Sequence, residues 1–495
     1  MNPPNTDLTE RSHLALEDAI LQGALKRATD TFIERRRDAV ATVPDWEGLR
    51  TRARQVKEHT INHLDYYLEQ LVEKVTTLGG QVYWAHTGDD VNRYIIELAR
   101  ARGVKSVVKA KSMTTEEIEL NHALEAAGVR PIETDLGEYI IQLAHEKPSH
   151  IIVPAIHKTR EQISDLFEEK LKAGRPRGVS EITAMARARL RDEFLSAGMG
   201  ITGANFAIAE TGTIVLVENE GNIRLSTQVP KIHVAVVGIE KVIPRFEDLS
   251  VFLRLLPRSG TGQKLTAYTS FLNGPRVEDV FALDENPHAA GDGNGQRATE
   301  QRGSTQQPHE FHLILMDNGR TNILADKQMR ESLYCIRCGA CLNVCPVYQK
   351  IGGQAYGWIY PGPIGAIISP QLQGLEKAAE LPFASSLCGA CRDACPVAIN
   401  IPDLLLALRS KVREERGGKL SESLGIRGLS MVGRHPLLFR MAGKIARGLA
   451  GLLAKDGRIQ SVPLSPLNKW TRYRDLPAPS GGSFAKWWKD QGADD

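Results

Sequence analysis

The chain has 495 residues, of which 42% are hydrophobic and 24% charged, and its formal net charge is +3. These proportions are ordinary for a soluble protein, and the length exceeds what one hydrophobic core usually holds, so we expect two folded domains with extensions. No apolar run reaches the ~20 residues that span a bilayer, and the polar N-terminus lacks the apolar core of a signal peptide. The sequence argues against an integral membrane protein and predicts a cytoplasmic one.

The first 60 residues are expected to form a helical arm, because apolar residues recur at helical spacing from residue 13 to residue 80. After Gly80 the pattern changes to short apolar runs that alternate with amphipathic segments. Strands are expected at 81–85, 106–110, 129–134 and 150–156, and helices at 92–101 and 114–127. Strands separated by helices predict a mostly parallel sheet covered on both faces, so residues 61–285 are assigned to an α/β domain.

The later part of this domain is expected to hold a basic helix at 181–197, a hairpin at 206–227 and a strand at 231–243. The hairpin should turn at residues 220–222, which separate two strand-like runs. Between the helix and the hairpin, residues 198–203 match the G-x-G-x-x-G pattern of dinucleotide-binding proteins. That pattern needs a preceding strand, whereas here a helix precedes it, so we expect a loop and no nicotinamide site.

One carboxylate of the α/β domain is a candidate catalytic residue. Glu210 lies beside a tight turn in the segment Ala209–Thr213, a geometry that could present it to a pocket as a base or a substrate anchor. The alternative is a turn residue at the end of a strand. The lack of a nearby histidine or metal motif favours this alternative.

A glycine-rich segment, Ser259–Gln263, follows an apolar helix. Its backbone N–H groups could bind an anion, but most such segments merely end a helix. We therefore expect a helix terminus here.

The cysteines lie in a second domain, which is assigned to residues 311–410 and begins with a short strand at 311–317. The preceding residues 286–310 are rich in Gly, Gln and polar side chains and are expected to form a flexible loop. All seven cysteines fall in two copies of one motif, CIRCGACLNVCP from Cys335 to Pro346 and SSLCGACRDACP from Ser385 to Pro396. This C-x2-C-x2-C-x3-C-P spacing is typical of bacterial ferredoxins, in which three close thiolates hold one cluster.

The motif also predicts which cysteines share a cluster. In two-cluster ferredoxins the last cysteine of each run binds the cluster of the other run. This rule assigns one [4Fe-4S] cluster to Cys335, Cys338, Cys341 and Cys395. It assigns a second cluster to Cys345, Cys388 and Cys391, with Ser385 at the fourth position. Because one thiolate is missing, the second cluster is either [4Fe-4S] or [3Fe-4S].

A structural zinc site is the alternative use of clustered cysteines. Zinc sites usually separate their C-x2-C pairs by a dozen or more residues and rarely use three closely spaced thiols followed by C-P. A disulfide framework is less consistent still with seven cysteines and no export signal. The spacing therefore favours iron-sulfur clusters.

Residues 411–495 are expected to form a basic C-terminal region. From 409 to 474 the chain carries 15 Lys/Arg against 4 Asp/Glu. Residues 435–455 form a basic amphipathic helix, with Leu437, Met441, Ile445, Leu449 and Leu452 on one face. Packing against the parent domain is the more common role of such a helix, and a partner subunit or an anionic membrane surface is the alternative. We expect no nucleic-acid partner.

Four segments together resemble a known family. They are the cysteine motifs, the intervening IGGQAYGWIYPGPIGAIISP, the AIAETGT segment and the terminal KWTRYRDLPAPSGGSFAKWW. With these segments, the chain from about residue 60 onward resembles the iron-sulfur subunits (protein B) of bacterial lactate-utilisation systems. The resemblance implies an α/β lactate-utilisation domain related to coenzyme A transferases, an alpha-helical ferredoxin domain and a family-specific C-terminal region.

The resemblance also implies a function, namely work with two other subunits of a lactate-utilisation system that oxidises L-lactate to pyruvate. On this hypothesis the chain relays single electrons through its two clusters to a downstream acceptor that the sequence does not identify. Two alternatives remain open. Either the N-terminal domain itself binds and oxidises a 2-hydroxy acid with Glu210 in its site, or the chain is an iron-sulfur sensor without catalytic turnover.

Overall fold

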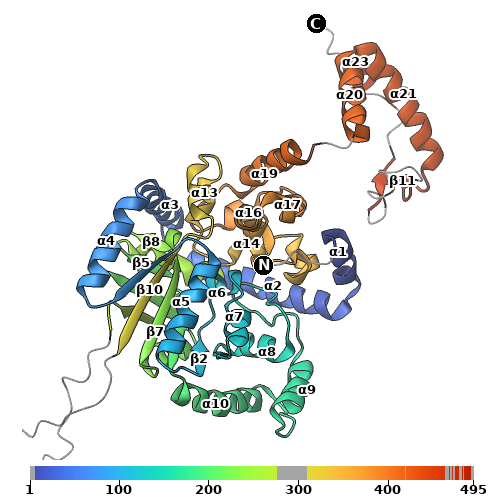
Figure 1. Cartoon of the computed structure of the whole chain (residues 1–495). Coiled ribbons are helices and arrows are strands. Elements are labelled where there is room, and N and C mark those ends of the chain that lie inside the picture. Colours follow the sequence, from blue (N-terminus) through green and yellow to red (C-terminus); the bar gives the residue numbers. More distant parts are fainter. Residues whose placement is uncertain are drawn as a thin grey trace, which may run out of the picture. The chain divides into compact units, whose positions relative to one another are not determined.

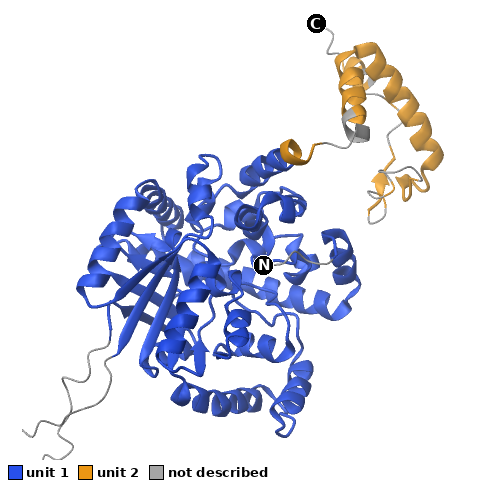
Figure 2. Ribbon diagram, viewed as in Figure 1, with its two compact units in different colours: residues 1–412 blue, residues 413–495 orange. Residues whose placement is uncertain are grey.

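The computed structural model describes residues 6–275, 309–417, 420–462, 468, 471, 474–478, 482 and 484–491. The chain divides into two compact units, residues 1–412 and 413–495 (Figure 2). The first unit contains both the α/β domain and all seven cysteines. The loop expected at 286–310 lies almost entirely outside the described residues.

A six-stranded parallel sheet forms the centre of the first unit (Figure 1). Its strands, in spatial order, are β1 (Gln81–Ala85), β10 (Glu310–Met316), β7 (Ile232–Gly238), β4 (Met199–Thr202), β2 (Ser106–Lys109) and β3 (Arg130–Glu133). Every neighbouring pair is parallel. The predicted parallel sheet is therefore confirmed.

Both faces of this sheet are covered, because successive side chains of a strand point to opposite faces. On β7, Val234 and Val236 pack with the helices α5 (Gly88–Ala101) and α7 (Leu120–Ala126). The alternate residues Ala235 and Val237 belong to a second core with α3 (Trp46–Asn62) and α4 (Leu64–Thr77). The remaining helices of the domain are α6 (Met113–Glu117), α8 (Leu136–Ala144), α9 (Arg160–Leu171), α10 (Val179–Ser196), α11 (Asn222–Gln228) and α12 (Leu249–Gly260).

A second sheet has four strands, and all four lie between β4 and β10 in the sequence. Its order is β8 (Val242–Ile243), β5 (Phe206–Ile208), β6 (Thr213–Glu218) and β9 (Tyr268–Leu272). β5 and β6 form an antiparallel hairpin that turns at residues 209–212, where Gly212 has a φ of +69°. The hairpin predicted to turn at 220–222 is thus wrong, since Asn222 begins helix α11.

Three other local predictions were wrong. Residues 198–203 contain the buried strand β4 rather than a loop, and residues 150–156 form no strand. The strand expected to open the ferredoxin domain is β10, which lies between β1 and β7 in the α/β sheet. A long-range strand pairing decides this placement, so the local pattern at 311–317 could not reveal it.

The helical arm packs against the cysteine region. It consists of α1 (Leu8–Glu17), α2 (Ala19–Ala41) and the start of α3. α1 contacts α15 (Tyr348–Ile351) and η3 (Gln354–Tyr356), and α2 contacts α12 and α15. The Arg11 guanidinium forms an ion pair with Glu380 at 2.8 Å.

The cysteine region consists of short helices, as predicted for a ferredoxin-like segment. They are α13 (Arg320–Ala325), η2 (Arg330–Tyr334), α14 (Ala340–Asn343), α15, η3, α16 (Gly362–Gln373), α17 (Leu375–Ala378), η4 (Leu381–Phe383), α18 (Ala390–Ala394) and α19 (Ile401–Arg416). The last of these, α19, crosses the boundary between the two units at residue 412.

The second unit holds the helices α20 (Leu420–Arg434), α21 (Pro436–Leu453) and α23 (Phe484–Asp490). A short antiparallel pair joins β11 (Arg458–Ile459) to β12 (Leu476–Pro477). The apolar residues of α21 are exposed, among them Leu437, Met441, Ile445, Leu449 and Leu452. Across the described ranges, no helix combines the length and hydropathy needed to cross a membrane.

Candidate iron-sulfur centre and the adjoining cavity

The two cysteine runs adopt the same backbone turn. In the first run the Arg337 N–H donates to Cys335 Sγ at 3.4 Å, and Arg337 has a φ of +61°. In the second run the Leu387 N–H donates to Ser385 Oγ at 3.1 Å, and Leu387 has a φ of +56°. Left-handed φ values are uncommon for such residues, so their recurrence marks a shared conformation. Ser385 therefore occupies the place in its loop that Cys335 occupies in the first.

The short helix that follows each turn brings the two runs together, since α14 contacts α18. Burial raises the pKa of Cys338, and the neighbouring thiols of Cys395 and Cys335 raise it further. Burial likewise raises the pKa of Cys391, to about 12, with the thiols of Cys345 and Cys388 contributing. Electrostatic effects between thiols weaken with distance. The thiol of Cys395 therefore acts on the pKa of Cys338 in the first run, and the thiol of Cys345 acts on that of Cys391 in the second.

A buried hydroxyl without a hydrogen-bond partner also suits a cluster at this site. Tyr356 is fully buried, and its hydroxyl finds no hydrogen-bond partner among the described residues. Burial raises the pKa of Tyr356, and thiols from both cysteine runs, those of Cys345, Cys341 and Cys391, raise it further. Cluster sulfurs are acceptors that such a hydroxyl can use.

The two sets differ in their surroundings. Arg50 donates through Nε to the Cys395 carbonyl at 2.9 Å and through Nη2 to the Arg392 carbonyl at 3.1 Å. Arg36 donates to the Ala394 carbonyl at 3.1 Å. Two arginines of the helical arm therefore hold the loop that leads to Cys395. In the second set, by contrast, Cys388 is exposed.

None of the seven cysteines, all of which the structure describes, forms a disulfide. Within the described part of the chain, no three Cys, His, Asp or Glu side chains converge tightly enough to enclose a single metal ion. A cluster needs more room than a single ion, and its thiolates lie around a cubane.

The cysteine region is joined to the α/β domain by buried polar contacts. His150 Nε2 lies 3.1 Å from Asn343 Oδ1, and the Tyr348 hydroxyl donates to the Ser149 carbonyl at 2.8 Å. The end of α12 approaches the first motif so closely that a Cβ on Gly260 would lie 2.9 Å from the Cys338 carbonyl. The first motif is therefore packed against the end of an α/β-domain helix.

A cavity of about 420 Å³ lies at this junction. Its walls include Lys111 and Ser112, which follow β2, and Thr202, Gly203 and Asn205, which end or follow β4. From β2 the chain continues outward to β3, whereas from β4 it continues in the opposite direction to β7. Ligands of open α/β sheets bind at the carboxyl ends of strands where the order reverses in this way. Cys338 also lines the cavity.

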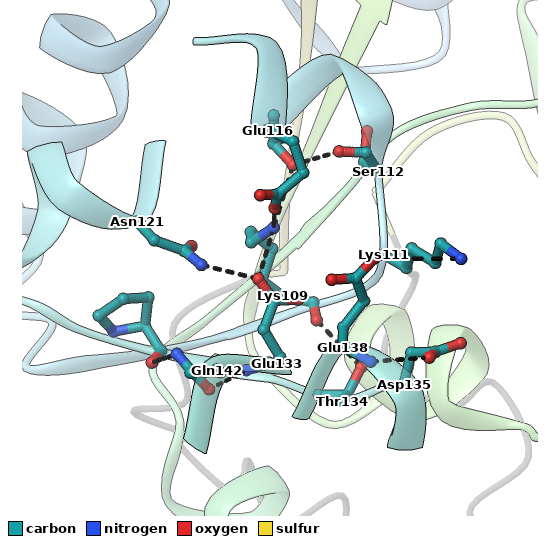
Figure 3. A network of polar contacts seen from close by, with 12 residues as sticks. Lys109, Lys111, Ser112, Glu116, Asn121, Glu133, Thr134, Asp135, Glu138 and Gln142 are labelled. Atoms are coloured by element: carbon teal, nitrogen blue, oxygen red, sulfur yellow. Dashed lines mark hydrogen bonds and ion pairs between the residues drawn. The ribbon is translucent and has the colours of Figure 1, made fainter. Parts of the chain in front are cut away.

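A buried ion-pair network adjoins Lys111, Ser112 and Asp135, three residues that line the cavity (Figure 3). The Lys109 ammonium, fully buried on β2, lies 2.6 Å from Glu116 and 2.7 Å from Glu133. Lys111 lies 4.0 Å from Glu138, whose pKa burial raises to about 8. This network fixes the carboxyl ends of β2 and β3, from which Lys111 and Asp135 reach the cavity.

The sequence-predicted catalytic candidate lies elsewhere. Glu210 is exposed at the hairpin turn, accepts a hydrogen bond from the Phe246 N–H at 2.9 Å, and does not line the cavity. The segment Ser259–Gln263 does end α12, and Thr261 and Gln263 nevertheless line the cavity. Sequence reasoning missed Lys111, Lys241 and Arg337 as wall residues, although the position of Lys111 directly after a predicted strand was an available signal.

Comparison with known proteins gives matches to three family models. Residues 68–291 match the LUD domain, residues 331–399 the 4Fe-4S dicluster domain, and residues 409–493 the C-terminal region of lactate utilisation protein B. The first range stops short of β10, which completes the sheet.

Several full-length relatives are similar throughout. The protein named lactate utilization protein B of Shouchella clausii is 44% identical over 482 residues, 97% of this chain and 96% of the relative. The Bacillus pumilus protein of the same name is 45% identical over 482 residues, 97% of this chain and 96% of the relative. An Escherichia coli protein named uncharacterized electron transport protein YkgF is 42% identical over 485 residues, 98% of this chain and 97% of the relative.

Proposed function

Because the chain belongs to the lactate utilization protein B family, we propose that it is the iron-sulfur electron-transfer subunit of a lactate-oxidising system. Electrons released when L-lactate becomes pyruvate pass through its two clusters to a downstream acceptor. The chemistry on carbon then belongs to a partner, and two other subunits complete the system. The absence of a spanning helix among the described residues agrees with work in the cytoplasm.

The observation that carries this proposal is the pairing of the two cysteine runs. We assign Cys335, Cys338 and Cys341 to one ligand set with Cys395, and Cys388 and Cys391 to the other with Cys345. The electrostatic neighbours of these thiols divide in the same way. Two such sets place two centres within one small region, which suits a one-electron relay better than a single structural metal site.

The residues around the first set are suited to an anionic centre. When bound, a cluster supplies reversible one-electron chemistry. The buried thiols must lose their protons on loading, so assembly releases protons. Arg36 and Arg50 bring positive charge to the Cys395 loop and hold its backbone, which stabilises the ligands in place.

A relation of the α/β domain to coenzyme A transferases is part of the same proposal. Such proteins share an α/β sheet with its binding cavity at the carboxyl ends of the strands, as here. Fold likeness says nothing about which reaction, if any, this domain has kept.

The direct test is lactate-dependent reduction of the clusters. The chain, purified without oxygen, should be brown and carry roughly seven or eight iron atoms. With its two partner subunits present, L-lactate should bleach the visible absorption, and omission of either partner should prevent this. Stoichiometric zinc without visible absorption would contradict the proposal. If dithionite reduces the clusters but lactate with both partners does not, the electron relay is also contradicted and the sensor alternative is favoured.

The second unit is proposed to bind a partner subunit or an anionic membrane surface. Its helix α21 exposes an apolar face, and the helix also carries Arg440, Lys444 and Arg447. A chain that ends at residue 417 keeps every cysteine and all of α19. This truncated chain should retain its iron yet bind less to partner subunits in pull-downs or to anionic vesicles in flotation. Equal binding by both chains would assign the unit a purely structural role.

A further inference from the structure

The cavity beside the first cysteine motif has walls of unequal charge. Three carboxylates line it, Asp135, Glu218 and Glu220, and each already accepts hydrogen bonds from backbone N–H groups. Glu218, for example, accepts from the Ile223 N–H at 2.7 Å. These carboxylates are therefore held by the protein itself.

The cations that line the cavity are less well matched. Lys241, at the end of η1 (Ile239–Lys241), is 7% exposed and lines the cavity. No hydrogen bond or ion pair of its ammonium group is found within the described ranges of the chain. A cation that lines a cavity without a protein partner is available to an anionic ligand, because a charge-assisted hydrogen bond to an anion is strong.

Arg337 adds a second incompletely matched cation to the same wall. Its Nη1 is buried and finds no hydrogen-bond partner among the described residues, and its Nη2 lies 3.4 Å from Glu240. Glu240 is shared, because Arg320 Nε also pairs with it at 2.6 Å. Arg320 also pairs with Glu117 at 2.9 Å, so Glu240 and Glu117 together face three cations, namely Arg320, Arg337 and Lys241.

We propose that this cavity binds an organic anion whose carboxylate or phosphate is held by Lys241, with Arg337 adding positive charge to the same wall, beside the loop of Cys338. The volume of about 420 Å³ is that of a site for a drug-sized ligand rather than for a three-carbon acid alone. Apolar wall residues, among them Met113, Leu216 and Leu256, suit a ligand with a ring or chain body. Anion binding in this cavity is a property separate from the electron relay. Only a redox role for the bound anion would rest on the proposed function.

A competing explanation is that Lys241 balances the charge of the first cluster alone. Lys241 lies within electrostatic range of Cys335 as well as of Arg337. The two explanations differ in a measurable way, because only the first makes ligand affinity depend on Lys241.

The test uses the full-length, iron-loaded chain without oxygen. Flavin mononucleotide serves as the phosphate-bearing probe, followed by quenching of its fluorescence, and L-lactate and pyruvate serve as small carboxylates, followed by calorimetry. Lys241→Met removes the charge but keeps the apolar stem, and Lys241→Arg restores a cation. Lys327→Met, at an exposed lysine outside the cavity, is the matched control. Iron content and melting temperature are measured for every variant.

We expect flavin mononucleotide to bind saturably and Lys241→Met to weaken it about tenfold or more, with Lys241→Arg recovering part of the affinity. Lys327→Met should leave it unchanged. If Lys241→Met fails to fold, Thr266→Trp, which places a bulky ring in the cavity wall away from the cysteines, should block binding in its place. Binding of lactate or pyruvate alone, with the same dependence on Lys241, would support the site and identify its ligand as a small carboxylate.

Failure to bind any of the three anions would overturn the inference. So would binding that is indifferent to both Lys241→Met and Thr266→Trp. A changed electron paramagnetic resonance signal of the first cluster in Lys241→Met, without any ligand binding, would assign the lysine to the cluster. None of these outcomes touches the electron relay, which cluster content and lactate-dependent reduction test separately.

Discussion

The two cysteine loops share one backbone turn but differ in their surroundings. The first set is complete in thiols, and arginines of the helical arm hold the backbone that leads to its fourth member, Cys395. The second set has Ser385 where a thiol is expected, and its Cys388 is exposed. One duplicated motif has thus produced a protected site and an accessible site. The difference teaches that copies of one motif can acquire different surroundings, and we expect those surroundings as well as the motif to determine how firmly each cluster is held.

The largest expected effect concerns which cysteine serves which cluster. Cys345→Ala should damage the second cluster and spare the first, although Cys345 belongs to the first run. Cys395→Ala should do the reverse, because we assign the fourth thiol of each run to the cluster of the other run. Each variant should lose roughly three or four iron atoms. Electron paramagnetic resonance of the reduced protein then identifies the surviving cluster.

If Cys345→Ala instead abolished the cluster held by Cys335, Cys338 and Cys341, the exchange of fourth ligands would be wrong. The electron relay itself would survive that result. Iron counts alone do not separate the two assignments, so the spectra of the two variants must be compared directly.

The next effect concerns the missing thiol. A serine hydroxyl is a far weaker iron ligand than a thiolate, because it stays protonated near neutral pH. Mild oxidation should therefore convert the second cluster to [3Fe-4S], which electron paramagnetic resonance detects. Ser385→Cys should suppress that signal, because Ser385 occupies the place of Cys335 in an equivalent turn. The neighbouring Ser386→Cys is a matched control that should leave the signal intact.

A smaller effect is expected from the arginines of the first site. Arg50→Leu removes a positive charge that lies against the Cys395 carbonyl, so the reduced and more negative cluster loses stabilisation. The potential of the first cluster should fall, on the order of 50 mV for one partly screened charge, and that of the second should not. Arg37→Leu, at an exposed arginine on α2 paired with Asp38, is the control. Equal shifts in both clusters would remove the distinction between the two sites.

The sequence predicted the chemistry of the centre better than its surroundings. The spacing of Cys335 and its partners is a local signal, and the alternation of strands and helices correctly indicated a parallel sheet. The place of β10 was not predictable, because parallel pairing joins it to β1 and β7 across more than two hundred residues in one case. Lys241 was missed for the same reason, since only the folded sheet brings it to the wall that Cys338 also lines.

The smallest expected effect concerns the counterpart of Arg50 at the second site. Arg409 donates through Nε to the Pro382 carbonyl at 2.8 Å and through Nη2 to the Ser385 carbonyl at 3.0 Å, and it lies over the Phe383 ring. Like Arg50, it holds the backbone of a loop that supplies a fourth ligand position. Arg409 is only half-buried, so water can replace part of its hydrogen bonding to the loop. A hydrogen bond of this kind contributes about 1 kcal/mol to stability.

Arg409→Leu should therefore speed iron loss from the second cluster by only a few-fold, while the first cluster is unaffected. The rate is measured by the growth of the [3Fe-4S] signal in air. Arg413, one turn further along α19 and exposed, gives the control Arg413→Leu. The double variant with Ser385→Cys sharpens the comparison, because a thiolate at position 385 should make the second cluster insensitive to Arg409. Sensitivity that persists in the double variant would show that Arg409 acts on the whole loop and that the serine alone does not explain the weakness of the second site.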